Sequence, residues 1–271
     1  MFIIRKKVIM ALHVDKVFIL SLLKNKEKVE KKFTSMFDSS MHKKLEFFYI
    51  GGCGPNTTND GQYDSTLVSI LKHNTIDEIS KDIFKNHVSI YRKAKKEGLK
   101  RIMILEEDAF FTSMPVSQCN AVNKFLTTKS YDIFYLGYVN WPRIWSTFSS
   151  FHIVQPSSPL TCHAYIMNYT GIDKVLSLLE NNTTITELHI DKFLSEEKSL
   201  SKFAVFPQIA FQEKPPSLFI KACDKLGISI NFNVFCRWNE NISLYLPFVL
   251  VFFILSTFFF KKKKNKLLLS L

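Results

Sequence analysis

A run of nineteen residues without a charge, Ile242 to Phe260, lies near the C-terminus and is followed directly by four lysines. As a helix rising about 1.5 Å per residue, this run would reach roughly 28 Å, close to the thickness of the hydrocarbon layer of a bilayer. Tyr245 near its start and the lysines after its end are typical of residues at a membrane interface. We therefore expect a transmembrane helix over 242–260 and a basic tail over 261–271. A buried core helix is the alternative, although core helices of this length usually carry a polar stripe.

The side of the membrane on which the rest of the chain lies stays open. The positive-inside rule places the lysine tail in the cytosol and the preceding domain outside or in a lumen. Charges interrupt the apolar stretch at the N-terminus, so no clear signal peptide is visible, and insertion through the tail would leave the domain in the cytosol. Glycosylation sequons fit a lumenal domain but are also expected by chance in a chain rich in Asn and Thr. They lie at Asn56, Asn168, Asn181, Asn182 and Asn241.

The net charge of +12, from 36 basic and 24 acidic residues, does not by itself indicate a nucleic-acid partner. Five lysines, Lys261 to Lys264 and Lys266, cluster behind the apolar run, which is more typical of a membrane protein. The five cysteines form no C-x-x-C pair, which argues against a zinc knuckle or a thioredoxin-like site. Cys223 and Cys236 could pair in an oxidising compartment, and small core residues are the alternative.

Short apolar runs alternate with helical patterns over most of the remaining chain. Runs rich in β-branched and aromatic residues predict strands, and apolar residues at three- and four-residue spacing predict helices. The expected strands are 16–22, 45–50, 101–105, 132–136, 162–167 and 203–206. The clearest helix is expected over 82–97, with Gly98 at its end, and others are expected after residue 22, from Thr170, and over 191–194.

This alternation predicts an α/β domain over 16–215, preceded by an N-terminal extension at 1–15 and followed by a juxtamembrane segment at 216–241. In such domains, ligands bind beyond the carboxyl ends of the strands. Three acids, Glu106, Glu107 and Asp108, come directly after the strand at 101–105. The sequence therefore places its most concentrated negative charge where a ligand would bind.

The acidic triplet has the residue types of a divalent-cation site. Acids directly after an apolar strand are costly unless they bind a cation or face water. In an extended chain Glu106 and Asp108 point the same way and Glu107 points the opposite way. Carboxylates suit Mg²⁺ or Mn²⁺, which typically bridge one or two of them to substrate phosphates. The spacing thus predicts a metal clamp formed by Glu106 and Asp108, and a solvated loop is the alternative.

The segment from Asn86 to Ala109 closely resembles glycosyltransferase family 25, which includes bacterial lipooligosaccharide galactosyltransferases and procollagen galactosyltransferases. The hallmark of that family is a helix opened by Ser-His, a short turn, and an apolar strand ending in Glu-Asp-Asp. Here Asn86 replaces the serine and Glu107 replaces the middle aspartate. Residues 17–22, 132–137 and 163–167, Gly171, and the pair Ile190-Asp191 follow the family order, so the resemblance spans about residues 16–212.

The resemblance implies a GT-A fold, a Rossmann-type domain that binds a nucleotide sugar, with Mn²⁺ or Mg²⁺ at Glu106 and Asp108. It also implies a UDP-hexose donor, inversion at the anomeric carbon, and donor contacts near Leu22, Asn86 and Glu107.

An inverting transfer needs a carboxylate base separate from the metal, and Asp191 is our candidate. Its alternative role is that of an acid stabilised at a helix N-terminus. His87 is either an active-site contact, as the resemblance implies, or a core histidine. His163 or His189 could complete the metal shell. Trp141 and Trp145 could stack on a sugar or pack on the surface.

We therefore expect a membrane-anchored, metal-dependent, inverting glycosyltransferase that moves a hexose, galactose or glucose, to a glycan or protein hydroxyl, for example in lipopolysaccharide biosynthesis. One alternative keeps the fold without turnover, as a sugar-binding or scaffold domain, because Asn86 and Glu107 depart from the pattern. The other is a binder of nucleic acid or anionic membranes that depends on charge alone, with affinity that falls steeply with salt.

Overall fold

The computed structural model describes residues 12–50, 77–140, 146–181 and 189–213, together with 225, 231, 234–242, 244–246 and 249. Several predicted features lie outside these residues: most of the N-terminal extension, Trp141 and Trp145, Cys223, most of the predicted transmembrane run, and the basic tail. Within the described residues, no helix is both long and apolar enough to cross a membrane.

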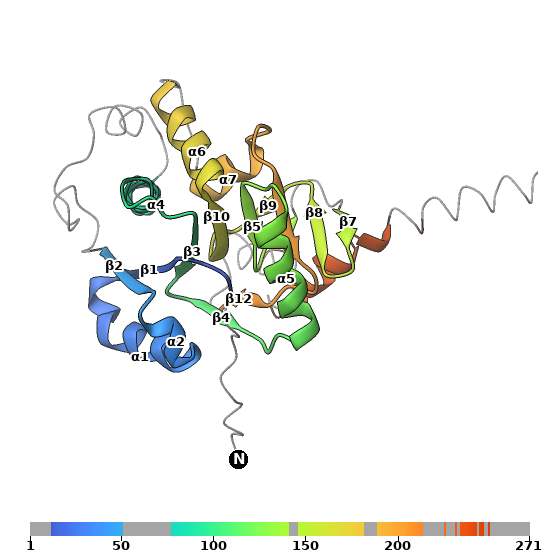
Figure 1. The fold of residues 1–271 in the computed structure, drawn as a ribbon, viewed down its shortest axis with the longest axis horizontal. Coiled ribbons are helices and arrows are strands. Elements are labelled where there is room, and N and C mark those ends of the chain that lie inside the picture. The colour runs from blue at the N-terminus through green and yellow to red at the C-terminus, as the bar shows by residue number, and fades with distance from the viewer. Residues whose placement is uncertain are drawn as a thin grey trace, which may run out of the picture.

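The centre of the domain is an eight-stranded sheet with the strand order β2-β1-β3-β10-β5-β11-β8-β7 (Figure 1). Strands β2, β1 and β3 are parallel to one another, and β5 is parallel to β11. Strand β10 is antiparallel to both of its neighbours, and β8 is antiparallel to β11 and β7. The bounds are β1 Lys16–Leu22, β2 Leu45–Ile50, β3 Arg101–Glu106, β5 Ile133–Tyr135, β7 Ser146–Ser150, β8 Ile153–Pro156, β10 Ala164–Asn168 and β11 Lys202–Val205. The predicted α/β class is confirmed, with a central mixed sheet in which all strands except β10 and β8 run in the same direction.

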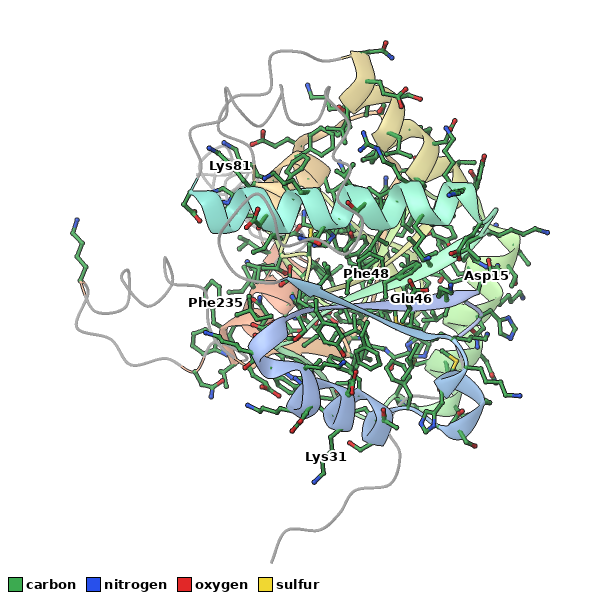
Figure 2. All side chains as sticks on the ribbon, turned by 90° about the vertical axis from the view of Figure 1, so that its left-hand side faces the viewer. Asp15, Lys31, Glu46, Phe48, Lys81 and Phe235 are labelled. Carbon is green, nitrogen blue, oxygen red and sulfur yellow. The ribbon has the colours of Figure 1, made fainter. Side chains whose placement is uncertain are left out.

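Helices cover both faces of this sheet, and Figure 2 shows α4 on one side and α1 on the other. The bounds are α1 Lys26–Met36, α2 Ser39–His42, α4 Glu78–Lys96, α5 Val116–Thr128, α6 Tyr169–Asn181 and α7 Ile190–Glu196, with a short 3-10 helix, η1, at Leu23–Asn25. Side chains alternate across the buried strand β1: Phe18 packs with α4, α6 and α7, whereas Ile19 packs with α1 and α5. The sheet therefore separates two apolar cores.

Helix α4 runs close to the predicted bounds of 82–97 and begins one turn earlier. The Asp77 carboxylate caps it by accepting a hydrogen bond from the Ser80 amide at 2.9 Å. At the other end Gly98 adopts φ +65°, a left-handed conformation that favours glycine and ends the helix. Both ends of α4 are thus fixed by local sequence.

Two short strand pairs lie outside the main sheet. Strand β4 (Ala109–Phe111) pairs with β12 (Ala210–Gln212), and β6 (Val139–Asn140) pairs with β9 (Pro159–Leu160). The first pair places Gln212 opposite Ala109, next to the acidic triplet. A segment more than a hundred residues away in sequence therefore borders the end of β3.

Residues 234–242 form a helix, here called the docking helix, that packs against the domain. Asn239 and Asn140 exchange two hydrogen bonds, at 2.7 and 2.9 Å, and Glu240 accepts one from the Gln208 amide at 2.7 Å. Leu244, just beyond it, is fully buried in the same apolar core as Phe18. The described end of the predicted juxtamembrane segment is thus part of the domain surface.

Candidate active site

Three predicted site carboxylates line one cavity of about 290 Å³ at the carboxyl end of β3. Glu106 ends β3, Asp108 follows it in the turn to β4, and Asp191 lies in the first turn of α7. The full lining is Ser80, Ile83, Glu106, Asp108, Thr161, Cys162, His189, Ile190, Asp191 and Gln212. The structure therefore brings together side chains from five separate parts of the chain at the edge where the sheet predicts a ligand.

The Asp108 carboxyl is electrostatically frustrated. Burial, then the negative charge of Glu106, raises its pKa to about 7, although Lys32 opposes this. Its buried Oδ1 atom has no hydrogen-bond partner among the described residues. Two acids that face one cavity without a sufficient positive charge have the oxygen chemistry of a divalent-cation site.

Glu107 points away from this cavity, as strand alternation predicts, and joins the ends of β1 and β3. Its carboxylate accepts hydrogen bonds from Ser21 Oγ at 2.8 Å, from the Leu22 amide at 3.0 Å and from Asn25 Nδ2 at 2.9 Å. Leu22 and Glu107, both predicted to contact a donor, therefore bind each other here. Their role toward a donor stays a prediction.

Lys32 of α1 supplies a positive charge that the sequence did not single out. Its ammonium group donates to the Glu107 carbonyl and forms an ion pair with Glu213, both at 2.8 Å. The Glu213 amide in turn donates to the Asp108 carbonyl at 2.8 Å. Lys32 and Glu213 thus hold the backbone of the acidic turn, and neither is among the residues that line the cavity. Lys32 belongs to the lysine-rich sequence of α1, which was the available signal for a basic contact here.

His87 lies behind Glu106 and not among the residues that line the cavity. Its Nδ1 atom is 2.7 Å from the Tyr165 hydroxyl, which is 2.5 Å from the Tyr91 hydroxyl. Its Nε2 atom faces Glu106 at 3.8 Å. Because His87 is fully buried, this arrangement fits a group that orients Glu106 rather than one that touches substrate. Asn86 is also buried, and its Nδ2 atom donates to the Asp82 carbonyl within α4.

Asp191 lines the same cavity as Glu106 and Asp108, the two carboxylates predicted to hold a metal. Burial raises the pKa of this carboxyl, and the charge of Glu106 adds to the effect, while hydrogen bonds from the backbone of Lys192 and Thr161 oppose it. Thr161 adopts φ +77°, a costly conformation for a β-branched residue. Such strain occurs most often at functional sites. Thr161 is a residue that no sequence pattern marked.

The two histidines considered as further metal ligands differ in position. His189 lines the cavity, as the residue that precedes α7. His163 is buried beside Gly137 and the Ala210 backbone, and it is not among the residues that line the cavity. Burial lowers its pKa. Among residues 12–50, 77–140, 146–181 and 189–213, no three His, Cys, Asp or Glu side chains stand close enough to hold a metal by themselves.

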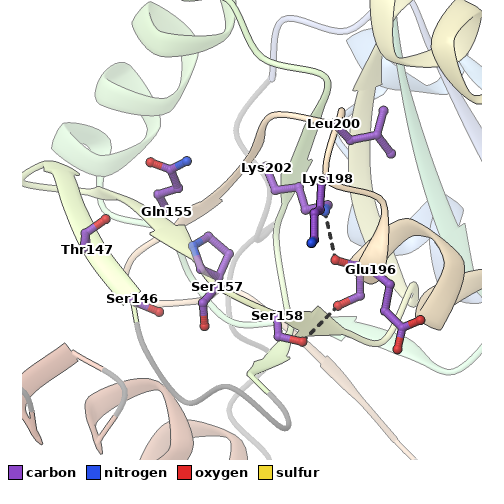
Figure 3. Close-up of a pocket in the computed structure, with 11 residues that line it drawn as sticks. Ser146, Thr147, Gln155, Ser157, Ser158, Glu196, Lys198, Leu200 and Lys202 are labelled. Carbon is purple, nitrogen blue, oxygen red and sulfur yellow. Dashed lines mark hydrogen bonds between the residues drawn. The ribbon is translucent and has the colours of Figure 1, made fainter.

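A second cavity, of about 610 Å³, lies at the other end of α7 and is lined largely by serines and lysines (Figure 3). Lys202 is nearly buried there and donates to the carbonyl groups of Ser195, at 2.8 Å, and Glu197, at 2.5 Å. Burial lowers the pKa of Lys202 to about 8. These contacts satisfy free carbonyls at the end of α7, so a structural role accounts for this lysine.

The fold and the cavity define an α/β protein with an acidic site at the carboxyl edge of its sheet.

No family model and no curated protein matches the chain. The A197 protein from STIV is 9% identical with a TM-score of 0.35, over 74% of this chain and 86% of that chain. A glycosyltransferase involved in the glycosylation of the major capsid of PBCV-1 is 11% identical with a TM-score of 0.29, over 62% and 68%. HddC from Yersinia pseudotuberculosis, complexed with GMP-PN, is 13% identical with a TM-score of 0.32, over 78% and 77%.

Proposed function

We propose that this protein is a metal-dependent glycosyltransferase that uses a nucleotide sugar. The observation that carries the proposal is the state of Asp108, whose pKa burial and Glu106 raise to about 7 while its buried oxygen lacks a partner. A divalent cation bound between Glu106 and Asp108 would stabilise the charged form of Asp108 and would give its buried oxygen a partner. The resemblance of residues 86–109 to glycosyltransferase family 25 agrees with this chemistry.

Glu106 and Asp108 fit such a cation because Mg²⁺ and Mn²⁺ are commonly held by one or two carboxylates together with substrate phosphates. Two protein ligands are therefore sufficient when the diphosphate of a donor supplies others. Bound there, the metal would supply positive charge that stabilises the departing nucleoside diphosphate.

We propose Asp191 as the base that accepts the proton of the acceptor hydroxyl as this hydroxyl attacks the anomeric carbon. Its raised pKa makes it a stronger base than an exposed aspartate. It lines the same cavity as Glu106 and Asp108 but comes from α7 on another wall. A base opposite the leaving group is the arrangement that inversion requires.

Three residues behind the site hold these groups in position. His87 faces Glu106 at 3.8 Å, Glu107 ties the end of β3 to β1, and Lys32 holds the acidic turn from outside the cavity. Since side chains locked by packing and hydrogen bonds lose less entropy on binding, this support favours a preorganised site.

The identity of the donor and the attachment to a membrane are further parts of the proposal. We propose a UDP-hexose donor, galactose or glucose, and an acceptor hydroxyl on a glycan or protein, as in lipopolysaccharide biosynthesis. Leu244 packs in the domain core, so the membrane attachment that we propose begins after it, in the uncharged residues that continue to Phe260 and are followed by lysines.

The test uses the full chain in detergent, with nucleotide release measured for a panel of UDP- and GDP-sugars. We expect release from one donor with Mn²⁺, loss with chelator, and a fall of at least about a hundredfold in Asp108→Asn. Asp173→Asn, an exposed acid on α6, is the matched control and should keep full activity. A folded chain that releases nothing and binds neither Mn²⁺ nor nucleotide would instead support the sugar-binding or scaffold alternative.

A further inference from the structure

The docking helix and the residues that follow it expose a row of large apolar side chains. The exposed fractions are 49% for Val234, 61% for Trp238, 46% for Ile242, 51% for Tyr245 and 59% for Val249. The intervals are four, four, three and four residues, so these side chains lie along one face of a helix. We call this face the apolar stripe. An aligned row differs from the isolated apolar residues that every protein surface carries.

The opposite face of the same helix is bound to the domain. Cys236, Asn239 and Glu240 are buried, and Leu244 is fully enclosed in the core. The hydrogen bonds of Asn239 and Glu240 reach the backbone of residues 140 and 208, and the Arg237 guanidinium lies 4.8 Å from the centre of the Phe211 ring. Since these contacts fix the rotation of the helix, they also fix the direction in which the apolar stripe faces.

The chain itself indicates what covers the stripe. Directly beyond Tyr245 the sequence continues without a charge to Phe260 and then into the lysines from Lys261. Trp238 and Tyr245 are the residue types enriched where a membrane meets water. Ile242, Tyr245 and Val249 belong to this uncharged run, and Val234 and Trp238 come shortly before it, so the stripe is continuous in sequence with the run.

We propose that the apolar stripe lies against the interfacial region of a lipid bilayer and holds the domain in one orientation to the membrane. This rests on the membrane attachment proposed above but not on the transferase activity. The segment that Glu240 holds continues from Gln208 into β12, whose Gln212 lines the acidic cavity. Residues 208–212 therefore contact the docking helix at one end and line the cavity at the other. This connection keeps the cavity at a constant position above the bilayer.

The experiment uses tryptophan fluorescence of the full chain in phosphatidylcholine vesicles, with or without brominated acyl chains. The chain has three tryptophans, so Trp141→Phe with Trp145→Phe leaves Trp238 as the reporter. We expect blue-shifted emission, strong quenching by the brominated lipid and weak quenching by iodide. The matched control replaces all three tryptophans by Phe and adds Tyr169→Trp at an exposed position of α6. That reporter should respond to iodide and not to bromine.

Two results would overturn the proposal. Iodide quenching of Trp238 equal to that of the control would show that the stripe faces water. Protection from iodide without bromine quenching, lost on dilution of the protein among vesicles, would show that a second copy covers the stripe. Neither readout depends on catalysis, so a failure of the transferase proposal is distinguished from a failure of this one.

Discussion

At the scale of single residues, the site combines two kinds of acid. Asp108 and Asp191 face the cavity with raised pKa values, whereas Glu107 is neutralised by three protein donors. The sequence predicted the opposite directions of Glu107 and its neighbours, because alternation is a local property of a strand. It did not predict the partners of Glu107, since Ser21, Leu22 and Asn25 lie more than eighty residues away and meet it only through the pairing of β1 with β3.

The raised pKa of Asp108 makes the stability of the metal-free protein depend on pH. Because burial and Glu106 raise this pKa to about 7, the stability contributed by the protonated carboxyl is complete below pH about 4 and is lost as the pH rises through about 7. Asp108→Asn should remove this loss and raise the free energy of unfolding at pH 8 by up to about 4 kcal/mol. Urea unfolding in chelator between pH 5 and 8 measures it. A constant difference between variant and parent across that range would contradict it.

Replacing Glu107 by Gln should destabilise the fold without touching the cavity. The amide keeps one acceptor oxygen for three donors, so we expect a loss of about 1–3 kcal/mol in the free energy of unfolding. Glu196→Gln, at an exposed position of α7, is the control and should change it by less than about 0.5 kcal/mol. Equal effects of the two substitutions would show that the contacts of Glu107 do not hold β1 to β3.

At the scale of elements, the buried strands and the capped helix α4 could be predicted from local sequence. The exposed strands, helix α5 and the direction of β10 could not. The predicted strands at 101–105, 132–136 and 203–206 correspond to β3, β5 and β11 within one or two residues. Strands β7 and β8 were missed, because the serine-rich and largely exposed β7 carries no apolar alternation. Helix α5 was missed although Cys119, Val122 and Phe125 lie at helical spacing. The antiparallel direction of β10 depends on pairing across the sheet, which a local pattern cannot show.

Two glycines that end elements should respond very differently to substitution by Ala. Gly98 has open space around it, so only its left-handed backbone makes Ala unfavourable, by about 1 kcal/mol. A Cβ at Gly137 would lie 2.1 Å from the Ala210 carbonyl oxygen and 2.5 Å from His163 Nε2. Gly137→Ala should therefore cost more than about 3 kcal/mol, since backbone must move. Thermal unfolding of both variants measures the difference as a fall in melting temperature. A smaller fall for Gly137→Ala than for Gly98→Ala would contradict the prediction.

At the scale of the whole molecule, the docking helix joins the acidic site to the end of the chain. Buried polar contacts hold it, and one of them titrates near neutral pH, because burial raises the pKa of Glu240 to about 8 against the charge of Arg237. Composition and hydropathy predicted a segment next to a membrane. They did not predict that Asn239 and Glu240 would bind the domain, because these contacts span 99 and 32 residues.

The attachment of the docking helix should weaken as Glu240 ionises. The stability contributed by its protonated carboxyl is lost as the pH rises through about 8, since the pKa of Glu240 is raised in the folded state. Glu240→Gln keeps an oxygen for the Gln208 amide without gaining a charge. At pH 9, hydrogen exchange of residues 234–242 should therefore be slower in Glu240→Gln than in the parent, and equal at pH 6. Equal exchange at both values would contradict this.

The burial of Leu244 in the same core as Phe18 sets the order in which this protein can be made. Phe18 leaves the ribosome early, whereas Leu244 lies more than two hundred residues later in the sequence. Synthesis proceeds from the N-terminus, so the first strand must wait, already translated, for a side chain near the other end. The domain can therefore complete its core only after the docking helix and Leu244 have left the ribosome, so the fold closes on a segment that is made long after its first strand.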